Sequence, residues 1–260
     1  MTTRPVSPEL TVLYRIPSGS NAVYHCVDAW GDSWVYKPSA GERPLLDFPD
    51  GSLAAREIAA HAVSEALGWG LVPQTVAAHG PGGPGMAQRW IAEVDREQRP
   101  GHDPVDVHPA DAVPGNRAVV LRGEGDRGEE VVVAHDTDDR LRRIALFDLV
   151  VNNADRKGGH VLVDSEGVVW AIDHGLSFHT APKLRTVLWG WAGHSFTDDE
   201  VAGLERLRGE LAEDGDLTEA LSDLLSSTEV EALSERVVAL LASRVFPVPG
   251  PGYPLPWPLF

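Results

Sequence analysis

The chain has 260 residues, 43% of them hydrophobic, so it can bury a sizeable core in one large domain or two tightly joined lobes. Its 39 acidic and 22 basic side chains give a formal net charge of -17, which disfavours nucleic acid and anionic membrane surfaces as partners. The single cysteine, Cys26, excludes an intrachain disulfide, and the N-terminal sequence lacks the apolar segment of a signal peptide. We therefore expect a cytoplasmic protein without a transmembrane segment.

The first part of the chain predicts an antiparallel sheet. Apolar and polar residues alternate over residues 10–37, and turn-forming residues interrupt the pattern at 17–21 and 30–32. Three strands are expected there. Two further strands, at 71–79 and 86–92, flank a turn rich in glycine and proline.

One main helix is expected between these two groups of strands. Apolar residues recur at near-helical spacing from Leu53 to Leu67. Ser52 is suited to cap the start of this helix, and Gly68 is suited to end it. Glu57 falls within the predicted helix.

The rest of the chain predicts a larger, mostly helical part. Residues 95–117 are rich in Pro, Asp and His without periodicity, which indicates an irregular crossing between two lobes. A hairpin at 119–133, a helix at 138–152 and two short strands at 160–164 and 168–172 follow, and then three helices. We therefore expect an N-lobe at 1–94, a crossing at 95–117, a C-lobe at 118–246 and a proline-rich tail at 247–260.

Two short segments carry the predicted chemistry. The segment NNADRKGGHVL, residues 152–162, follows a predicted helix, and the segment AIDHG, residues 171–175, ends the next strand. A hairpin between them can return the chain so that Asp155 and Asp173 face one cleft. One carboxylate would then lie near an attacking hydroxyl and the other on a divalent metal that bridges nucleotide phosphates.

These segments resemble the catalytic and metal-binding loops of phosphatidylinositol 3-/4-kinase-like proteins, especially the type II phosphatidylinositol 4-kinase branch. The segment VYKP at 35–38 resembles that family's nucleotide-clamping lysine strand, and REIAA at 56–60 resembles its partner helix. The resemblance runs from about residue 16 to residue 178. It implies an α+β, two-lobed protein-kinase-like fold, with a small antiparallel-sheet N-lobe carrying one main helix and a larger, mostly helical C-lobe.

The resemblance implies an ATP- and Mg2+-dependent phosphotransferase that moves the γ-phosphate to a hydroxyl acceptor. Asp155 would orient or deprotonate the acceptor hydroxyl, and Asp173 would hold the metal. Lys37 would contact the nucleotide phosphates and be held by Glu57. From the position of Lys157 just after Asp155, we further expect it to neutralise charge on the transferred phosphoryl group. Further nucleotide contacts are expected from the turn Ser18, Gly19, Ser20 and Asn21, and from Gln88, Arg89 and Trp90 near the adenine.

One position departs from the family's pattern. Five residues after Asp155, where related sequences carry an asparagine as second metal ligand, this chain has His160. Because Mg2+ prefers oxygen ligands, an imidazole there predicts a preference for Mn2+, a metal site with one strong protein ligand, or a histidine that binds phosphate. A catalytically weak pseudokinase that binds nucleotide as a regulatory module, or a kinase-fold adenylyltransferase, therefore stays open as an alternative.

The acceptor is not determined by these motifs. The resemblance implies an inositol lipid head group, but the acidic composition and the lack of a basic or amphipathic surface segment argue against stable docking on anionic bilayers. A soluble polyol or a protein hydroxyl is equally compatible, because a fold does not determine a substrate. The ten histidines lack the tight spacing of zinc ligands, which disfavours a zinc enzyme.

Overall fold

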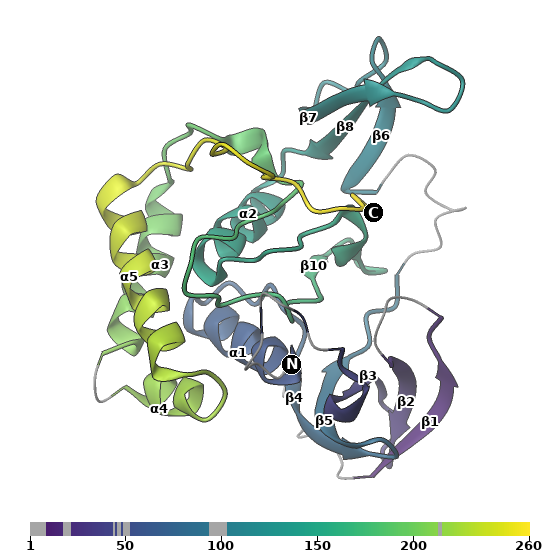
Figure 1. Ribbon diagram of the computed structural model, residues 1–260, viewed down its shortest axis with the longest axis vertical. Coiled ribbons are helices and arrows are strands. Elements are labelled where there is room, and N and C mark those ends of the chain that lie inside the picture. Colours follow the sequence, from purple (N-terminus) through teal and green to yellow (C-terminus); the bar gives the residue numbers. More distant parts are fainter. Residues whose placement is uncertain are drawn as a thin grey trace.

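The computed structural model describes residues 9–17, 22–43, 45, 48, 53–93, 103–212 and 215–260. A five-stranded antiparallel sheet forms the first lobe, and helices form most of the second (Figure 1). The strand order of the first sheet is β1-β2-β3-β5-β4. Its strands are β1 (Leu10–Arg15), β2 (Tyr24–Asp28), β3 (Ser33–Pro38), β4 (Thr75–Gly80) and β5 (Gly83–Arg89).

The alternation in β3 determines which side chains face the cleft. Trp34 and Tyr36 are fully buried in a small core on one face of the sheet, together with Cys26 from β2. Because successive side chains of a strand point to opposite faces, Val35 and Lys37 lie on the other face. The three strands predicted over residues 10–37 are confirmed.

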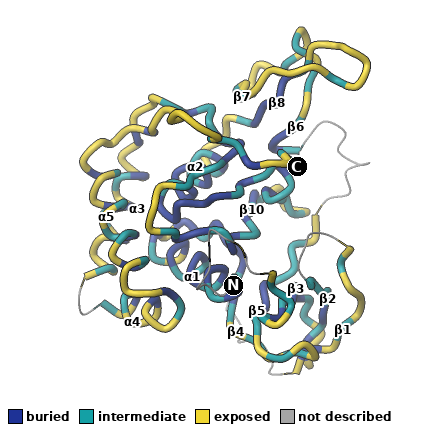
Figure 2. The backbone as a smooth tube through the Cα atoms, in the orientation of Figure 1, coloured by how far each residue is buried: buried dark blue, intermediate teal, exposed yellow. Residues whose placement is uncertain are grey.

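Helix α1 (Leu53–Ala66) follows the first three strands and packs both against β4 and β5 and against the helices of the second lobe. Its residues Ala59, Ala60 and Val63 are fully buried in the large core that also contains the helices of that lobe. Figure 2 shows buried backbone running through α1 and α2. Gly68, at φ +70°, ends the helix as predicted, whereas Ser52 lies outside the described residues.

The strand predicted at 71–79 starts later than expected, at Thr75. The N–H groups of Leu71 and Val72 donate to Ser64 Oγ of α1, at 2.8 and 3.2 Å, instead of pairing within the sheet. The carbonyl oxygen of Leu71 accepts from Ala171 N at 2.9 Å. This segment therefore connects α1 to the second lobe, and β4 begins only after it.

The crossing predicted to be irregular contains a strand, β6 (Val105–Pro109). It pairs with β8 (Glu130–Asp136), which also pairs with β7 (Arg117–Glu124), so that a three-stranded antiparallel sheet protrudes from the second lobe (Figure 1). The prediction was wrong here because Asp and Pro are uncommon in strands, so the local sequence does not indicate one. Pairing with β8 stabilises the strand. The predicted hairpin of β7 and β8 is confirmed.

The second lobe is built around α2 (Asp139–Val151), which Asp138 caps by accepting from two backbone N–H groups. The short strands β9 (Val161–Val163) and β10 (Val169–Ala171) form the predicted hairpin. Helix α5 (Ser227–Ser243) packs against both α2 and α3 (Asp198–Glu210). None of the helices in the described ranges is long and apolar enough to cross a membrane. The last three helices are α3 (Asp198–Glu210), α4 (Asp216–Ser222) and α5 (Ser227–Ser243).

Candidate active site

A cavity of about 770 Å3 lies between the two lobes. The apolar side chains in its lining, which we call the apolar part, include Ile16, Val23 and Val35 of the first lobe and Leu162 and Ile172 of the second. The other part is polar and contains ionisable side chains from both lobes. They include Lys37, Glu57, Asp155, Lys157, His160 and Asp173.

Lys37 joins the two lobes through a pair of carboxylates. Its Nζ lies 2.5 Å from Glu57 Oε1 and 2.9 Å from Asp173 Oδ1. The second oxygen of Glu57 accepts from His174 N at 2.9 Å, so one glutamate holds both the lysine and the turn after β10. Burial alone would lower the pKa of Lys37, but the Asp173 and Glu57 carboxylates hold it above its usual range. Lys37 in turn holds the pKa of Asp173 well below its usual range.

Asp155 lies in the same cavity and is paired with Lys157. The Lys157 Nζ is 3.1 Å from Asp155 Oδ2, and both side chains remain partly exposed. Burial raises the pKa of Asp155 above its ordinary value, and the Lys157 ammonium only partly offsets this effect. Asp155 is thus a carboxylate of raised basicity that opens to the cavity.

His160 is oriented so that its free nitrogen faces Asp173. Its Nδ1 lies 3.0 Å from the carbonyl oxygen of Asp155, which accepts, so Nδ1 carries the hydrogen. Nε2 lies 3.2 Å from Asp173 Oδ2. Burial lowers the pKa of His160 to about 4, so at neutral pH both facing atoms are hydrogen-bond acceptors.

Two acceptors at this separation are suited to share a divalent cation. Imidazole nitrogen with carboxylate oxygen is a donor set that suits Mn2+ better than Mg2+. In the part of the chain that the structure describes, no group of three or more His, Cys, Asp or Glu side chains gathers as a metal site. Asp173 and His160 would therefore hold a cation whose remaining ligands come from the nucleotide and water.

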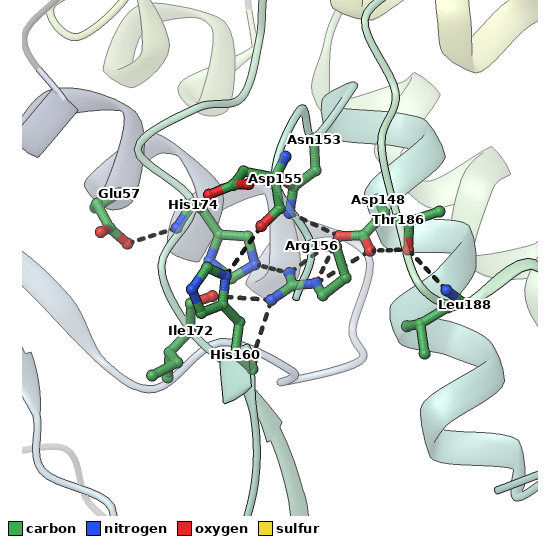
Figure 3. Close-up of polar contacts among 10 residues, drawn as sticks. All are labelled: Glu57, Asp148, Asn153, Asp155, Arg156, His160, Ile172, His174, Thr186 and Leu188. Atoms are coloured by element: carbon green, nitrogen blue, oxygen red, sulfur yellow. Dashed lines mark hydrogen bonds and ion pairs between the residues drawn. The ribbon is translucent and has the colours of Figure 1, made fainter. Parts of the chain in front are cut away.

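A second, buried set of polar side chains supports the two loops (Figure 3). The Arg156 side chain is fully buried and donates from Nε and Nη2 to Asp148, at 3.0–3.1 Å. Its Nη1 donates to the carbonyl oxygens of His160 and Ile172, at 3.1 and 2.8 Å. Its Nη2 also lies 2.6 Å from His174 Nε2, which accepts. One guanidinium group therefore connects the loop after α2 with the loop after β10.

Asp148 and Asn153 extend this support to Asp155. Asn153 Nδ2 donates to Asp148 Oδ1 at 3.0 Å, and Asn153 Oδ1 accepts from the backbone N–H of Asp155 at 2.9 Å (Figure 3). Thr186 Oγ1 donates to the other oxygen of Asp148 at 3.2 Å. The position of Asp155 is thus determined by a carboxylate of α2. The sequence carried a signal for this residue, because Asp148 interrupts the longest apolar stretch of the chain.

The backbone of Asp173 is strained. Its φ of 61° lies in the left-handed region, which non-glycine residues adopt at a cost of about 1–3 kcal/mol. The peptide groups on both sides are held in place. The carbonyl oxygen of Ile172 accepts from Arg156 Nη1 at 2.8 Å, and His174 N donates to Glu57. Strain maintained by two such contacts is a feature of functional sites.

The strand predicted to hold the adenine lies beside the apolar part of the cavity. Gln88, Arg89 and Trp90 all line it. The Arg89 guanidinium is 3.0 Å from Asp32 and stacks 4.6 Å from the Trp34 ring centre, so these contacts direct it away from the polar part of the cavity. The remaining predicted nucleotide contacts, Ser18, Gly19, Ser20 and Asn21, lie outside the described residues.

The proline-rich tail lines one side of the cavity, which the sequence did not predict. Pro258 and Phe260 line the cavity, and Leu259 O accepts from Gly158 N at 2.9 Å. A Cβ atom added to Gly158 would lie 2.6 Å from the Phe260 ring, so the glycine lets the ring contact the loop that carries Asp155. Figure 1 shows the tail returning across the second lobe to this position.

Comparison with known proteins gives one close sequence relative. The chain is 48% identical over 262 residues to Protein Rv2133c of Mycobacterium tuberculosis, and the match covers 97% of this chain and 92% of the relative. No family model matches the chain.

The solved structures that are similar in fold include two kinases. The Golgi casein kinase with Mn/ADP bound has a TM-score of 0.52 at 14% identity, over 96% of this chain and 78% of that one. The Helicobacter pylori proinflammatory kinase CtkA has a TM-score of 0.50 at 11% identity, over 91% of this chain and 92% of that one. At such identities the similarity shows the fold alone. It confirms the predicted two-lobed kinase-like fold.

Proposed function

The chain belongs to the family of Protein Rv2133c of Mycobacterium tuberculosis, and on its kinase-like fold we propose that it is an ATP-dependent phosphotransferase with a hydroxyl acceptor. The observation that carries this proposal is the convergence of Lys37, Asp155 and Asp173 on one cavity between the lobes. These three groups supply a phosphate contact, a proton acceptor and a metal ligand, which are the components that phosphoryl transfer needs.

Each side chain has a defined task in the proposed reaction. The acceptor oxygen attacks the γ-phosphorus, its proton passes to the Asp155 carboxylate, and the bond from the γ-phosphorus to the β–γ bridging oxygen breaks to release ADP. The raised pKa of Asp155 makes it a better proton acceptor than an ordinary carboxylate. Lys37 donates to phosphate oxygens while Glu57 keeps it in place. A divalent cation held by Asp173 and His160 would neutralise charge on the phosphates.

Two finer assignments are part of the proposal. The motifs around Asp155 and Asp173 favour the phosphatidylinositol 3-/4-kinase-like type among kinase folds. The net charge of -17 favours a soluble polyol or a protein hydroxyl over a head group in an anionic bilayer. The lobe boundaries near residues 94 and 117 remain a prediction, and α1 is the element that packs on both sides of them.

The test compares phosphate transfer by matched variants. Wild type, Asp155→Ala and Asp155→Asn would be incubated with ATP radiolabelled at the γ-phosphate, with Mg2+ or with Mn2+. Glu231→Gln on the exposed face of α5 removes a carboxylate that does not line the cavity and serves as control. We expect autophosphorylation or hydrolysis in wild type and Glu231→Gln, and a loss of at least about 10²-fold in both Asp155 variants.

The outcomes separate the alternatives. Equal signals in wild type and Asp155→Ala would exclude the proposed enzyme. Thermal stabilisation by nucleotide without turnover would favour the regulatory pseudokinase, for which the histidine at position 160 is the supporting observation. Intact-mass analysis of the product would distinguish a phosphate adduct from the AMP adduct of an adenylyltransferase.

A further inference from the structure

Gln88 carries an unused hydrogen-bond acceptor beside the apolar part of the cavity. It lies near the end of β5, opposite Val35 of β3, and is 4% exposed while lining the cavity. A buried glutamine is unusual unless its polar atoms have partners. The distribution of those partners determines what the side chain can recognise.

The orientation of the Gln88 amide is determined by Thr75. The Thr75 hydroxyl donates its only hydrogen to Pro73 O at 2.8 Å, so it can only accept from Gln88. It accepts from Gln88 Nε2, also at 2.8 Å. A flipped amide would place two acceptors against each other, so the amide nitrogen faces Thr75 and the amide oxygen does not.

The amide oxygen of Gln88 is available to a ligand. Among the residues that the structure describes, no donor reaches it, and it is not one of the buried polar atoms that are sealed without a partner. Because the side chain lines the cavity, its small accessible part opens there. The ring of a nucleotide base would occupy this apolar part, between Val35 of the first lobe and Ile172 of the second.

We propose that Gln88 selects adenine nucleotides, with its amide oxygen accepting a hydrogen bond from the exocyclic amine of the base. Guanine and hypoxanthine carry a carbonyl oxygen at that position, which would face the amide oxygen without a hydrogen between them. A freely rotating amide can hydrogen-bond to a base with an amine or to a base with a carbonyl oxygen, because it can present either its oxygen or its nitrogen. Thr75 is the positioning residue that prevents this. The inference rests on the proposed nucleotide site.

The experiment measures binding of ATP, GTP and inosine triphosphate by calorimetry in the presence of Mn2+. Inosine triphosphate differs from ATP in having a carbonyl group and a ring N–H in place of the amine, and it lacks the 2-amino group of GTP. We expect wild type to bind ATP about tenfold or more tightly than either of the others. In Gln88→Leu we expect the preference to fall to about twofold, mainly through weaker ATP binding.

Thr75→Val tests the orientation without removing the amide. This variant frees the amide to flip, so we expect stronger binding of inosine triphosphate and a smaller preference for ATP. Thr11→Val, the same change at an exposed position of β1, is the matched control and should keep the wild-type preference. Loss of packing alone would weaken the binding of all three nucleotides by a similar factor. The proposed role instead predicts a change in the ratio of their affinities.

The outcomes distinguish this inference from the proposed function. Wild type that binds ATP and inosine triphosphate equally would overturn the role of Gln88 and leave the phosphotransferase proposal standing. Wild type that binds no nucleotide would overturn both. Thr75→Val with an unchanged preference would contradict the positioning role, even in a protein in which Gln88→Leu fails to fold.

Discussion

Two groups of charged side chains lie side by side in this protein and differ in what surrounds them. Lys37, Glu57 and Asp173 face a cavity, and the Asp173 side chain is 46% exposed. Asp148 and Arg156 have no exposed side-chain surface. Both groups contain a cation at hydrogen-bonding distance from a carboxylate, two carboxylates in the first group and one in the second. Only the first is open to a ligand, whereas the second is occupied by the backbone of the two loops.

The difference indicates how a strained site is maintained. The side chains of Asp173, with its left-handed backbone, and of Asp155 are both partly exposed. Their backbones are held by Asn153 and by the Arg156 guanidinium, which bonds the carbonyl oxygens of both loops. We therefore expect changes in the buried group to lower stability and changes in the cavity group to lower activity.

Arg156→Leu should produce the largest effect on stability. Removal of the guanidinium leaves the Asp148 carboxylate buried without its cation, and such a loss lowers the free energy of unfolding by about 3–5 kcal/mol. Chemical denaturation followed by circular dichroism measures the change. The control is Arg122→Leu on the exposed part of β7, which should stay within about 0.5 kcal/mol of wild type. Equal stability of the two variants would contradict the supporting role.

Asp173→Asn should mainly lower activity, whereas Arg156→Leu should mainly lower stability. Asparagine, like aspartate, is enriched among non-glycine residues in the left-handed region, so we expect the backbone to be kept and the protein to fold. Its stability should fall only by the loss of the ion pair with Lys37, which keeps Glu57 as its other partner. Loss of the carboxylate that would hold the cation should reduce phosphate transfer by about 10²–10³-fold. Transfer assays combined with thermal melting test both parts. Undiminished transfer by a folded variant would remove Asp173 from the proposed mechanism.

His160→Asn should change the metal preference. With an imidazole nitrogen beside the Asp173 carboxylate, wild type is expected to be about tenfold more active with Mn2+ than with Mg2+. The amide oxygen of asparagine should reduce or reverse that ratio. Titration of each metal into metal-depleted protein gives the comparison. A ratio that is the same in both proteins would mean that His160 does not bind the cation.

Phe260→Ala should have the smallest effect. Removal of the ring opens the loop at Gly158 to water, so we expect ATP hydrolysis without an acceptor to rise a few-fold while ATP affinity stays within about twofold. Tyr253→Ala, an exposed aromatic of the same tail, is the control. Hydrolysis that is unchanged, or that changes equally in both variants, would show that the Phe260 ring does not exclude water from the cavity.

Local sequence determined much of the architecture. Alternation in β2 and β3 and the turn residues between them were enough to predict the first strands, because a two-residue period with one buried face has few alternatives. The segments around Asp155 and Asp173 placed two carboxylates after a helix and after a strand, and the expected hairpin of β9 and β10 brings both to the cavity. Both predictions use only residues that are close together in the sequence.

Tertiary structure decided the remainder, because it depends on contacts between residues far apart in the chain. Pairing with β8 makes β6 a strand, and packing places α1 in the core of the second lobe. The tail reaches Gly158 only after crossing that lobe, and the sequence of the tail contains no signal of this contact. Thr75 orients Gln88 from an adjacent strand. The composition of a segment records its local preferences, whereas the partner of a buried polar group is determined only when the chain has folded.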